Sequence, residues 1–161
     1  MRSLLAILLM AVLAVTGCGR FPTYTGPEVT RIIVNKSARQ LILMHHDEVL
    51  RAYEMELGFA PEGDKQIEGD GRTPEGSYVI DRRNPNSEFY LSIGISYPNE
   101  EDIAEAEALG ESPGGDIFIH GTPNPFRRGD DWTAGCIAIS NREMREVYSM
   151  VRLGTPIDIY P

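Results

Sequence analysis

Cysteine is scarce in this chain, which has 161 residues and only two cysteines, Cys18 and Cys136. Two cysteines form one disulfide at most, which excludes the disulfide-dense scaffolds of small secreted domains. The length suits one domain, and a domain of this size buries enough apolar surface to fold without disulfides or a structural metal. We therefore expect a single folded domain, and we expect no metal and no cofactor.

Positive charge is also in short supply, with 15 lysines and arginines against 24 aspartates and glutamates and a net charge of −9. Nucleic-acid binding requires clustered positive charge, because the protein must neutralise phosphates. The basic residues form local pairs but no stripe along the sequence. The composition thus argues against a nucleic-acid partner and is typical of a soluble acidic domain.

A long apolar run is missing as well. A helix needs roughly 20 apolar residues to span a bilayer, and the run at residues 4–15 is shorter than that. It follows Arg2 and matches the apolar core of a secretory signal. The run ends in Val15-Thr16-Gly17-Cys18. This ending is similar to a bacterial lipobox, in which the cysteine is lipidated and becomes the new N-terminus.

Three segments follow from this pattern. We expect a lipoprotein signal peptide at 1–17, a lipidated Cys18 with a tether that ends at residue 28, and a folded domain at 29–161. Lipid chains would then anchor the domain to a membrane. An ordinary cleaved signal and a Cys18–Cys136 disulfide are the alternatives. If Cys18 carries lipid, Cys136 is a lone thiol in an oxidising compartment, a liability unless it has a use.

The folded part alternates short β-rich runs with turn residues, a pattern that predicts strands. The predicted strands cover residues 31–34, 40–44, 48–55, 76–81, 89–96, 116–120, 136–139 and 156–160. The first three form a predicted three-strand meander. Glycines and two prolines in 58–76 predict a long loop before the fourth strand.

Two further segments predict helices. Residues 98–109 begin with a proline, have three acids in the first turn and precede Gly110. Ser140 and Glu143 form a capping box that opens a second helix, which ends before Gly154. The apolar residues of this helix share one face: Met144, Val147, Tyr148 and Val151. The predicted fold class is mainly β with two helices (α+β), with one helix packed on a sheet.

One pair of residues has the chemistry of a nucleophile and its base. A thiol attacks as the thiolate, and a nearby histidine can take its proton. Cys136 and His120 each lie at the edge of a predicted short strand, where a side chain can be rigid and still face a cleft. Gly135 leaves the approach to Cys136 open and lets backbone N–H groups point at a developing oxyanion. A Cys136–His120 site is the resulting hypothesis, and a buried inert cysteine is the alternative.

A metal site is not expected. His45 and His46 adjoin Asp47, but adjacent residues of a strand point to opposite faces and poorly share one ion. An exposed turn is the preferred interpretation of these three residues.

The segments around the pair resemble the L,D-transpeptidase (YkuD-type) catalytic domain family. The resemblance rests on IFIHGT at 117–122 and WTAGCIA at 132–138, with support from DGRTPEG at 70–76 and GTPI at 154–157. The WTAGC form is similar to one subgroup of murein L,D-transpeptidase homologues. The resemblance covers roughly residues 29–160 and implies an L,D-transpeptidase-like β-sandwich with a helix packed on one sheet.

The resemblance also implies roles for particular residues. Cys136 corresponds to the nucleophile and His120 to the proton donor and acceptor, oriented by the main-chain carbonyl of Gly121. Gly135 corresponds to the glycine beside the oxyanion hole. Thr133 takes the family's Ser/Thr position and is a candidate for substrate contact.

This chain departs from the family pattern at two positions. Ala134 stands where the family has a second histidine, and Ala138 stands where it has arginine or asparagine. These departures leave the nucleophile and base in place and put a substrate contact in question.

Three more residues are candidates for substrate contact. Trp132 either lines the cleft or caps the core. Arg127, beside Arg128, either binds a carboxylate of a peptidoglycan stem peptide or lies in solvent. Tyr97 lines the cleft or, as the favoured alternative, packs in the core.

The implied activity is acyl transfer on peptidoglycan stem peptides through a Cys thioester. A hydrolase with the same site is the first alternative, either an L,D-carboxypeptidase or an amidase that releases peptidoglycan-linked lipoprotein. A non-catalytic peptidoglycan-binding lipoprotein is the second. The expected setting is the bacterial cell envelope, as a periplasm-facing, monomeric lipoprotein of the outer membrane.

Overall fold

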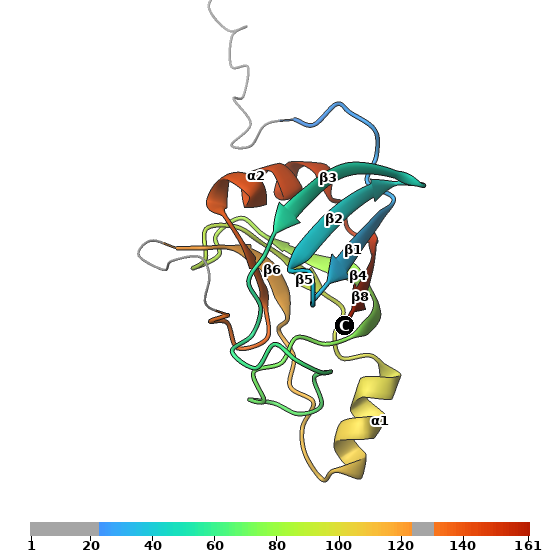
Figure 1. Cartoon of the computed structure of the whole chain (residues 1–161), viewed down its shortest axis with the longest axis vertical. Coiled ribbons are helices and arrows are strands. Elements are labelled where there is room, and N and C mark those ends of the chain that lie inside the picture. The colour runs from blue at the N-terminus through green and yellow to red at the C-terminus, as the bar shows by residue number, and fades with distance from the viewer. Residues whose placement is uncertain (1–22, 124–130) are drawn as a thin grey trace, which may run out of the picture.

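A computed structural model describes residues 23–123 and 131–161 (Figure 1). Eight strands of this described part form one sheet in the order β3-β2-β1-β8-β4-β5-β6-β7. The strands are β1 (Arg31–Asn35), β2 (Gln40–His45), β3 (Glu48–Glu54), β4 (Gly76–Asn84), β5 (Ser92–Ile95), β6 (Phe118–Gly121), β7 (Ile137–Ile139) and β8 (Pro156–Tyr160). The helices are α1 (Glu100–Ala108) and α2 (Asn141–Met150). The predicted α+β class is confirmed.

The N-terminal meander forms as predicted, with β1, β2 and β3 paired antiparallel. Alternate residues of the first two strands are buried, namely Ile32, Val34, Leu41 and Leu43. This alternation has the period of two residues that is typical of a strand in which one face of the sheet packs on the core.

The last strand in chain order lies in the middle of the sheet. β8 pairs parallel with β1 and antiparallel with β4. β4 pairs with β8 as far as Val79 and with β5 from Ile80 on, and the β4–β5 ladder has a register shift between Ile80 and Arg82. Such irregularities bend a strand, and one core cluster contains residues from both parts of the sheet.

The two ends of the sheet come together beyond β3. The Glu56 N–H donates to the Ala138 carbonyl at 2.9 Å, and the Ala138 N–H donates to the Glu56 carbonyl at 2.8 Å. Phe59 N–H adds a bond to the Thr133 carbonyl at 2.9 Å. Because Ala138 belongs to β7, the segment that follows β3 closes the sheet into a barrel-like form.

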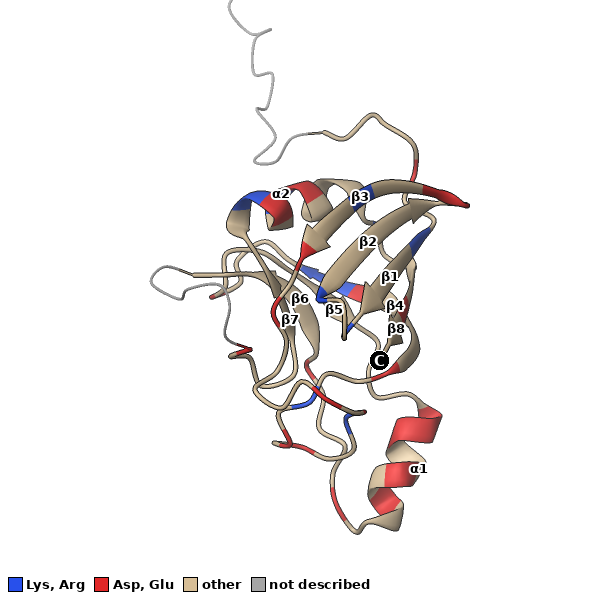
Figure 2. Ribbon diagram, viewed as in Figure 1, with Lys and Arg blue, Asp and Glu red and all other residues tan. Residues whose placement is uncertain are grey.

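The helices occupy different places. α2 begins at the predicted capping box of Ser140 and Glu143, buries its predicted apolar face and contacts β5 and β6. α1 projects from the body and is rich in acidic residues (Figures 1 and 2). It begins later than predicted, because the Asn99 side chain accepts hydrogen bonds from the Glu101 and Asp102 N–H groups and caps it. Within the described residues, neither helix is long and apolar enough to cross a membrane.

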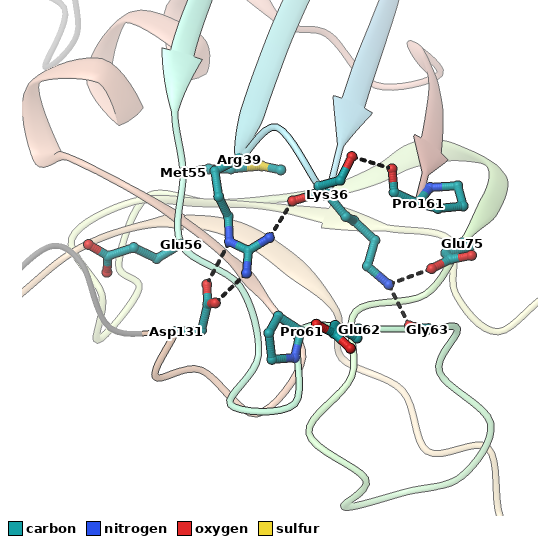
Figure 3. Close-up of a pocket in the computed structure, with 11 residues that line it drawn as sticks. Lys36, Arg39, Met55, Glu56, Pro61, Glu62, Gly63, Glu75, Asp131 and Pro161 are labelled. Carbon is teal, nitrogen blue, oxygen red and sulfur yellow. Dashed lines mark hydrogen bonds and ion pairs between the residues drawn. The ribbon is translucent and has the colours of Figure 1, made fainter.

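A buried lysine fixes the long loop between β3 and β4. The Lys36 side chain is only 2% exposed, and its Nζ donates to Glu75 Oε1 at 2.7 Å. The same nitrogen donates to the Gly63 carbonyl at 2.5 Å (Figure 3). It also donates to the Thr73 carbonyl at 3.0 Å. A buried ammonium is tolerated only when it is fully hydrogen-bonded. The loop therefore has a defined shape where it approaches the sheet.

Candidate active site

Parallel pairing of β6 and β7 brings His120 close to Cys136. Ile119 pairs with Ile137, and His120 pairs with Ala138. Both isoleucines are buried in the core. Since side chains alternate along a strand, His120 and Cys136, which directly precedes β7, lie on the opposite face of the sheet.

The two residues line the same pocket, which has a volume of about 270 Å³ and also includes Phe89 and Ser92. Cys136 borders a second, larger hollow of about 700 Å³, formed by Lys65, Glu68 and the Gly114–Asp116 region. The half-buried thiol thus lies where two hollows meet. A substrate can reach it from two sides.

A backbone contact fixes the protonation pattern of His120. Its Nδ1 lies 2.7 Å from the Gly121 carbonyl oxygen. A carbonyl oxygen only accepts hydrogen bonds, so Nδ1 carries the hydrogen and Nε2 is the nitrogen able to take a proton. The imidazole is 3% exposed. Burial lowers the pKa of His120, against the opposing effect of the Gly121 carbonyl.

Two aromatic rings hold the imidazole. Phe89 stacks on His120 with ring centroids 4.6 Å apart and an angle of 27° between the planes. Trp132 packs against it at 5.6 Å and 64°. The Trp132 indole N–H donates to Glu56 Oε2 at 2.5 Å. The base therefore has a backbone partner and aromatic neighbours that restrict its rotation.

Burial keeps the nucleophile protonated. Desolvation is the largest effect and raises the pKa of the Cys136 thiol; the Asp116 charge raises it further, while the Phe118 backbone N–H and Lys65 lower it. In this state the thiol donates a weak bond to the Asp116 carbonyl at 3.5 Å. With the pKa of His120 lowered as well, the resting pair is a neutral thiol and a neutral imidazole.

The turn before Cys136 requires glycine at 135. Gly135 has a φ of +127°, and a Cβ there would lie 2.6 Å from the Arg72 carbonyl oxygen. The Gly135 N–H donates to Thr133 Oγ1 at 3.2 Å, and that hydroxyl donates to the Cys136 carbonyl at 2.7 Å. The Gly135 amide is therefore engaged within the turn, which leaves the Cys136 N–H as the candidate oxyanion donor.

Two candidate substrate contacts, Thr133 and Tyr97, have hydroxyl groups that are bonded within the protein. Thr133 is 4% exposed and its hydroxyl holds the turn. Tyr97 is buried in the core, and its hydroxyl donates to the Pro113 carbonyl at 2.8 Å. The core position of Tyr97 agrees with the favoured alternative. For Thr133, a motif position does not reveal that the hydroxyl is bonded inside the protein. Arg127 and Cys18 lie outside the described residues.

The sequence analysis missed Phe89 and Glu56. Phe89 precedes β5, and its aromatic character was the only sequence signal. Glu56 follows the edge strand β3, and nothing local indicates that its carboxylate is 7% exposed and bonded to Trp132. Both contacts depend on how distant strands pair.

Two curated proteins that are similar to this chain are described as putative L,D-transpeptidases. A putative L,D-transpeptidase, YkuD, from Bacillus licheniformis is 31% identical over 136 residues, which is 81% of this chain and 66% of that protein. The putative L,D-transpeptidase YafK from Escherichia coli is 32% identical over 108 residues, 62% of this chain and 39% of that protein. This chain therefore matches well under half of the E. coli protein.

Solved structures share the fold. The helical cell shape determining protein Pgp2 from Campylobacter jejuni has a TM-score of 0.64 at 28% identity, covering 84% of this chain and 49% of that one. An L,D-transpeptidase from Mycobacterium smegmatis has a TM-score of 0.56 at 16% identity, covering 83% of this chain and 59% of that one. The second likeness concerns the fold alone.

The match to the family extends over nearly the whole folded part. The family model of the L,D-transpeptidase catalytic domain, YkuD, matches residues 29–159. This range contains both His120 and Cys136 and every strand and helix up to β8. With its sheet order, its pocket and this match taken together, the chain belongs to the YkuD family of L,D-transpeptidase catalytic domains.

Proposed function

We propose that this chain is a cell-wall L,D-transpeptidase that acts on peptidoglycan stem peptides through a thioester on Cys136. Family membership supports the reaction class. The observation that carries the assignment of residues is the shared pocket of Cys136 and His120, with Nδ1 of the histidine bonded to the Gly121 carbonyl.

The first half-reaction follows from the neutral pair. The Cys136 thiol leaves the Asp116 carbonyl and turns to His120, whose Nε2 takes its proton as Sγ attacks a stem-peptide carbonyl carbon. The tetrahedral oxyanion accepts a hydrogen bond from the Cys136 N–H. The C–N bond then breaks, His120 returns the proton to the departing amine, and a thioester remains on Sγ.

The acceptor determines the outcome of the second half-reaction. A stem-peptide amine gives up a proton to His120, attacks the thioester carbon and releases Cys136 as a thiol when that proton is returned. This route forms a new amide cross-link. Water in the same place gives hydrolysis, the outcome expected of a carboxypeptidase or an amidase.

The location of the protein is part of the proposal. Cys18 at the end of the apolar run would be the lipidated residue, and a tether to residue 28 would connect it to the domain. The domain would then face the periplasm from the outer membrane and act on peptidoglycan within reach of that tether.

The decisive experiment supplies defined substrates to the purified chain. Disaccharide-tetrapeptides and peptidoglycan with linked lipoprotein are incubated with the wild type and with Cys136→Ala and His120→Ala. Mass spectrometry reads the products. Cross-linked dimers support transfer, whereas tripeptides or released lipoprotein support the hydrolase alternative.

Both variants are expected to lose activity. Cys136→Ala removes the atom that forms the thioester, and His120→Ala lowers the rate by roughly 10²- to 10⁴-fold, the usual contribution of a general base. The absence of any product, together with no carbapenem adduct on Cys136, would overturn the proposal and favour a non-catalytic binding protein.

A further inference from the structure

Glu56, Ala138 and His120 lie in one row across neighbouring strands. Glu56 is paired with Ala138 through an antiparallel bridge, and Ala138 is paired with His120 in the parallel β6–β7 ladder. Directly paired residues present their side chains on the same face of a sheet. The side chains of Glu56 and His120 therefore lie on the same face, on either side of Ala138.

Trp132 connects the two ends of this row. Its indole N–H donates to Glu56 Oε2 at 2.5 Å, and its ring lies 5.6 Å from the His120 ring. Phe89 stacks on the imidazole as well, 4.6 Å away. The imidazole orientation thus depends on where the indole is held.

Asp131, the residue before Trp132, is held by hydrogen bonds from Arg39 and Leu57. Arg39 Nε and Nη2 donate to the two oxygens of Asp131, at 3.1 and 2.5 Å (Figure 3). The Leu57 N–H donates to Asp131 Oδ1 at 2.8 Å. Bidentate Arg–carboxylate pairs are geometrically specific. These hydrogen bonds fix the main chain that carries Trp132, and Glu56 fixes the direction of its ring.

The burial of Glu56 calls for a function. Glu56 is only 7% exposed, and burying a carboxylate costs free energy unless hydrogen bonds compensate for the lost water. Glu62 lines the same pocket as Glu56 but is exposed. Unlike Glu62, Glu56 is turned inward, and one of its partners is the indole ring that packs on the base.

We infer that Glu56 is a positioning residue for the reaction: by holding the Trp132 indole, it sets the orientation of His120 toward Cys136. This inference rests on the proposed function. Glu56 does not touch the reacting atoms, and its effect passes through Trp132. To hold the indole, the residue at this position must supply a hydrogen-bond acceptor, because the indole N–H is only a donor.

The test compares three full-length variants: Glu56→Leu, Glu56→Gln and Glu62→Leu. The rate of Cys136 acylation by a carbapenem is measured in single-turnover mode, with the rate constant and the half-saturating concentration determined separately. Glu56→Leu should lower the rate constant about tenfold, within the roughly 100-fold that a 1 Å misplacement can cost. The half-saturating concentration should not change. Glu56→Gln keeps the acceptor and should retain the wild-type rate, as should Glu62→Leu.

A second measurement follows the indole itself. Trp132 is the only tryptophan of the chain, so its indole N–H gives a single resonance in a ¹H–¹⁵N spectrum. That resonance should move in Glu56→Leu and stay near the wild-type position in Glu56→Gln. The remaining backbone resonances show whether each variant is folded. If Glu56→Leu does not fold, Trp132→Phe replaces it, since it keeps a ring beside His120 and removes the donor.

The outcomes separate the two proposals. Wild-type acylation rates in Glu56→Leu, with the indole resonance shifted, would overturn the role of Glu56 and leave the proposed function intact. Equal losses in Glu56→Leu and Glu56→Gln would also overturn it. A wild-type chain that forms no adduct would overturn the proposed function and this inference together.

Discussion

At the scale of single residues, burial acts on both reacting groups in the same sense. It raises the pKa of the Cys136 thiol and lowers the pKa of the His120 imidazole. Both shifts favour the uncharged form. The proton therefore has to move from sulfur to nitrogen during attack, and a preformed thiolate–imidazolium pair is not the resting state.

This pattern predicts the pH dependence of acylation. The base must be neutral, so the rate falls as the pH drops through the pKa of His120, which lies below its ordinary value of 6.5. Because the pKa of Cys136 lies above 9.0, free thiolate contributes only on the alkaline side. We expect a carbapenem acylation rate that is nearly constant from about pH 6.5 to pH 8. Stopped-flow rates across this range check it, and an acid limb centred above pH 7 would contradict it.

Gly135 offers a second test at this scale. Gly135→Ala puts a methyl group 2.6 Å from the Arg72 carbonyl oxygen at a φ of +127°. Backbone strain alone costs roughly 1–3 kcal/mol, and the overlap adds to it, so the unfolding free energy should fall by more than that. Gly69→Ala is the matched control, since Gly69 has a φ of +81° but open space around it. Urea unfolding of both variants measures the difference; equal losses would show that the Arg72 contact is unimportant.

At the scale of elements, local signals predicted what local interactions stabilise. The capping box at Ser140 and the apolar spacing of the second helix led to α2, and alternating apolar residues led to the meander. Strand ends were less accurate: β6 begins at Phe118 and β7 at Ile137, each later than the sequence suggested. Strand limits depend on pairing partners, which the local sequence does not specify.

The loop between β3 and β4 gives an element-scale prediction. Lys36→Met leaves the Glu75 carboxylate and two carbonyls without their donor. Breaking a buried pair on one side costs about 3 kcal/mol or more, and we expect a loss near this value. Arg51→Met, which removes a surface pair with Glu146, should cost less than about 1 kcal/mol. Chemical denaturation of the two variants compares these effects, and similar losses would contradict the role assigned to Lys36.

At the scale of the whole molecule, one continuous sheet carries both the meander and the site. β8 joins them, because it pairs with β1 on one side and β4 on the other. A substitution of Ile157, which is fully buried on β8, tests whether the two parts of the sheet unfold as one unit. Ile157→Ala should cost roughly 2–5 kcal/mol, the usual range for such truncations.

The two halves should also unfold together in that variant. Trp132 fluorescence reports on the site, and far-ultraviolet circular dichroism reports on the whole sheet. Coincident urea transitions would mark one cooperative unit. A fluorescence transition at lower urea than the dichroism transition would show that the site unfolds separately from the meander.

The contact between Glu56 and Trp132 could not be predicted from the sequence, because it depends on how the whole sheet pairs. The motifs identified Cys136, His120 and Gly121, since these residues stand close together around two short strands. Glu56 and Trp132 are 76 residues apart in the chain. Their contact exists only because the sheet closes, and closure depends on the register of strands that are distant in sequence.

The central place of β8 also bears on the order in which the molecule acquires its reactivity. Two long-range pairings join the meander to the β4–β7 half: the insertion of β8, the last described strand in chain order, and the bridge between Glu56 and Ala138. Such long-range pairing is slow, because the entropy of closing a large loop is lost before its contacts form. Until the sheet is complete, Glu56 cannot hold Trp132, and the imidazole of His120 lacks the aromatic neighbour whose position that contact sets. The thiol would become an efficient nucleophile only at the end of folding, which limits misdirected acylation along the way.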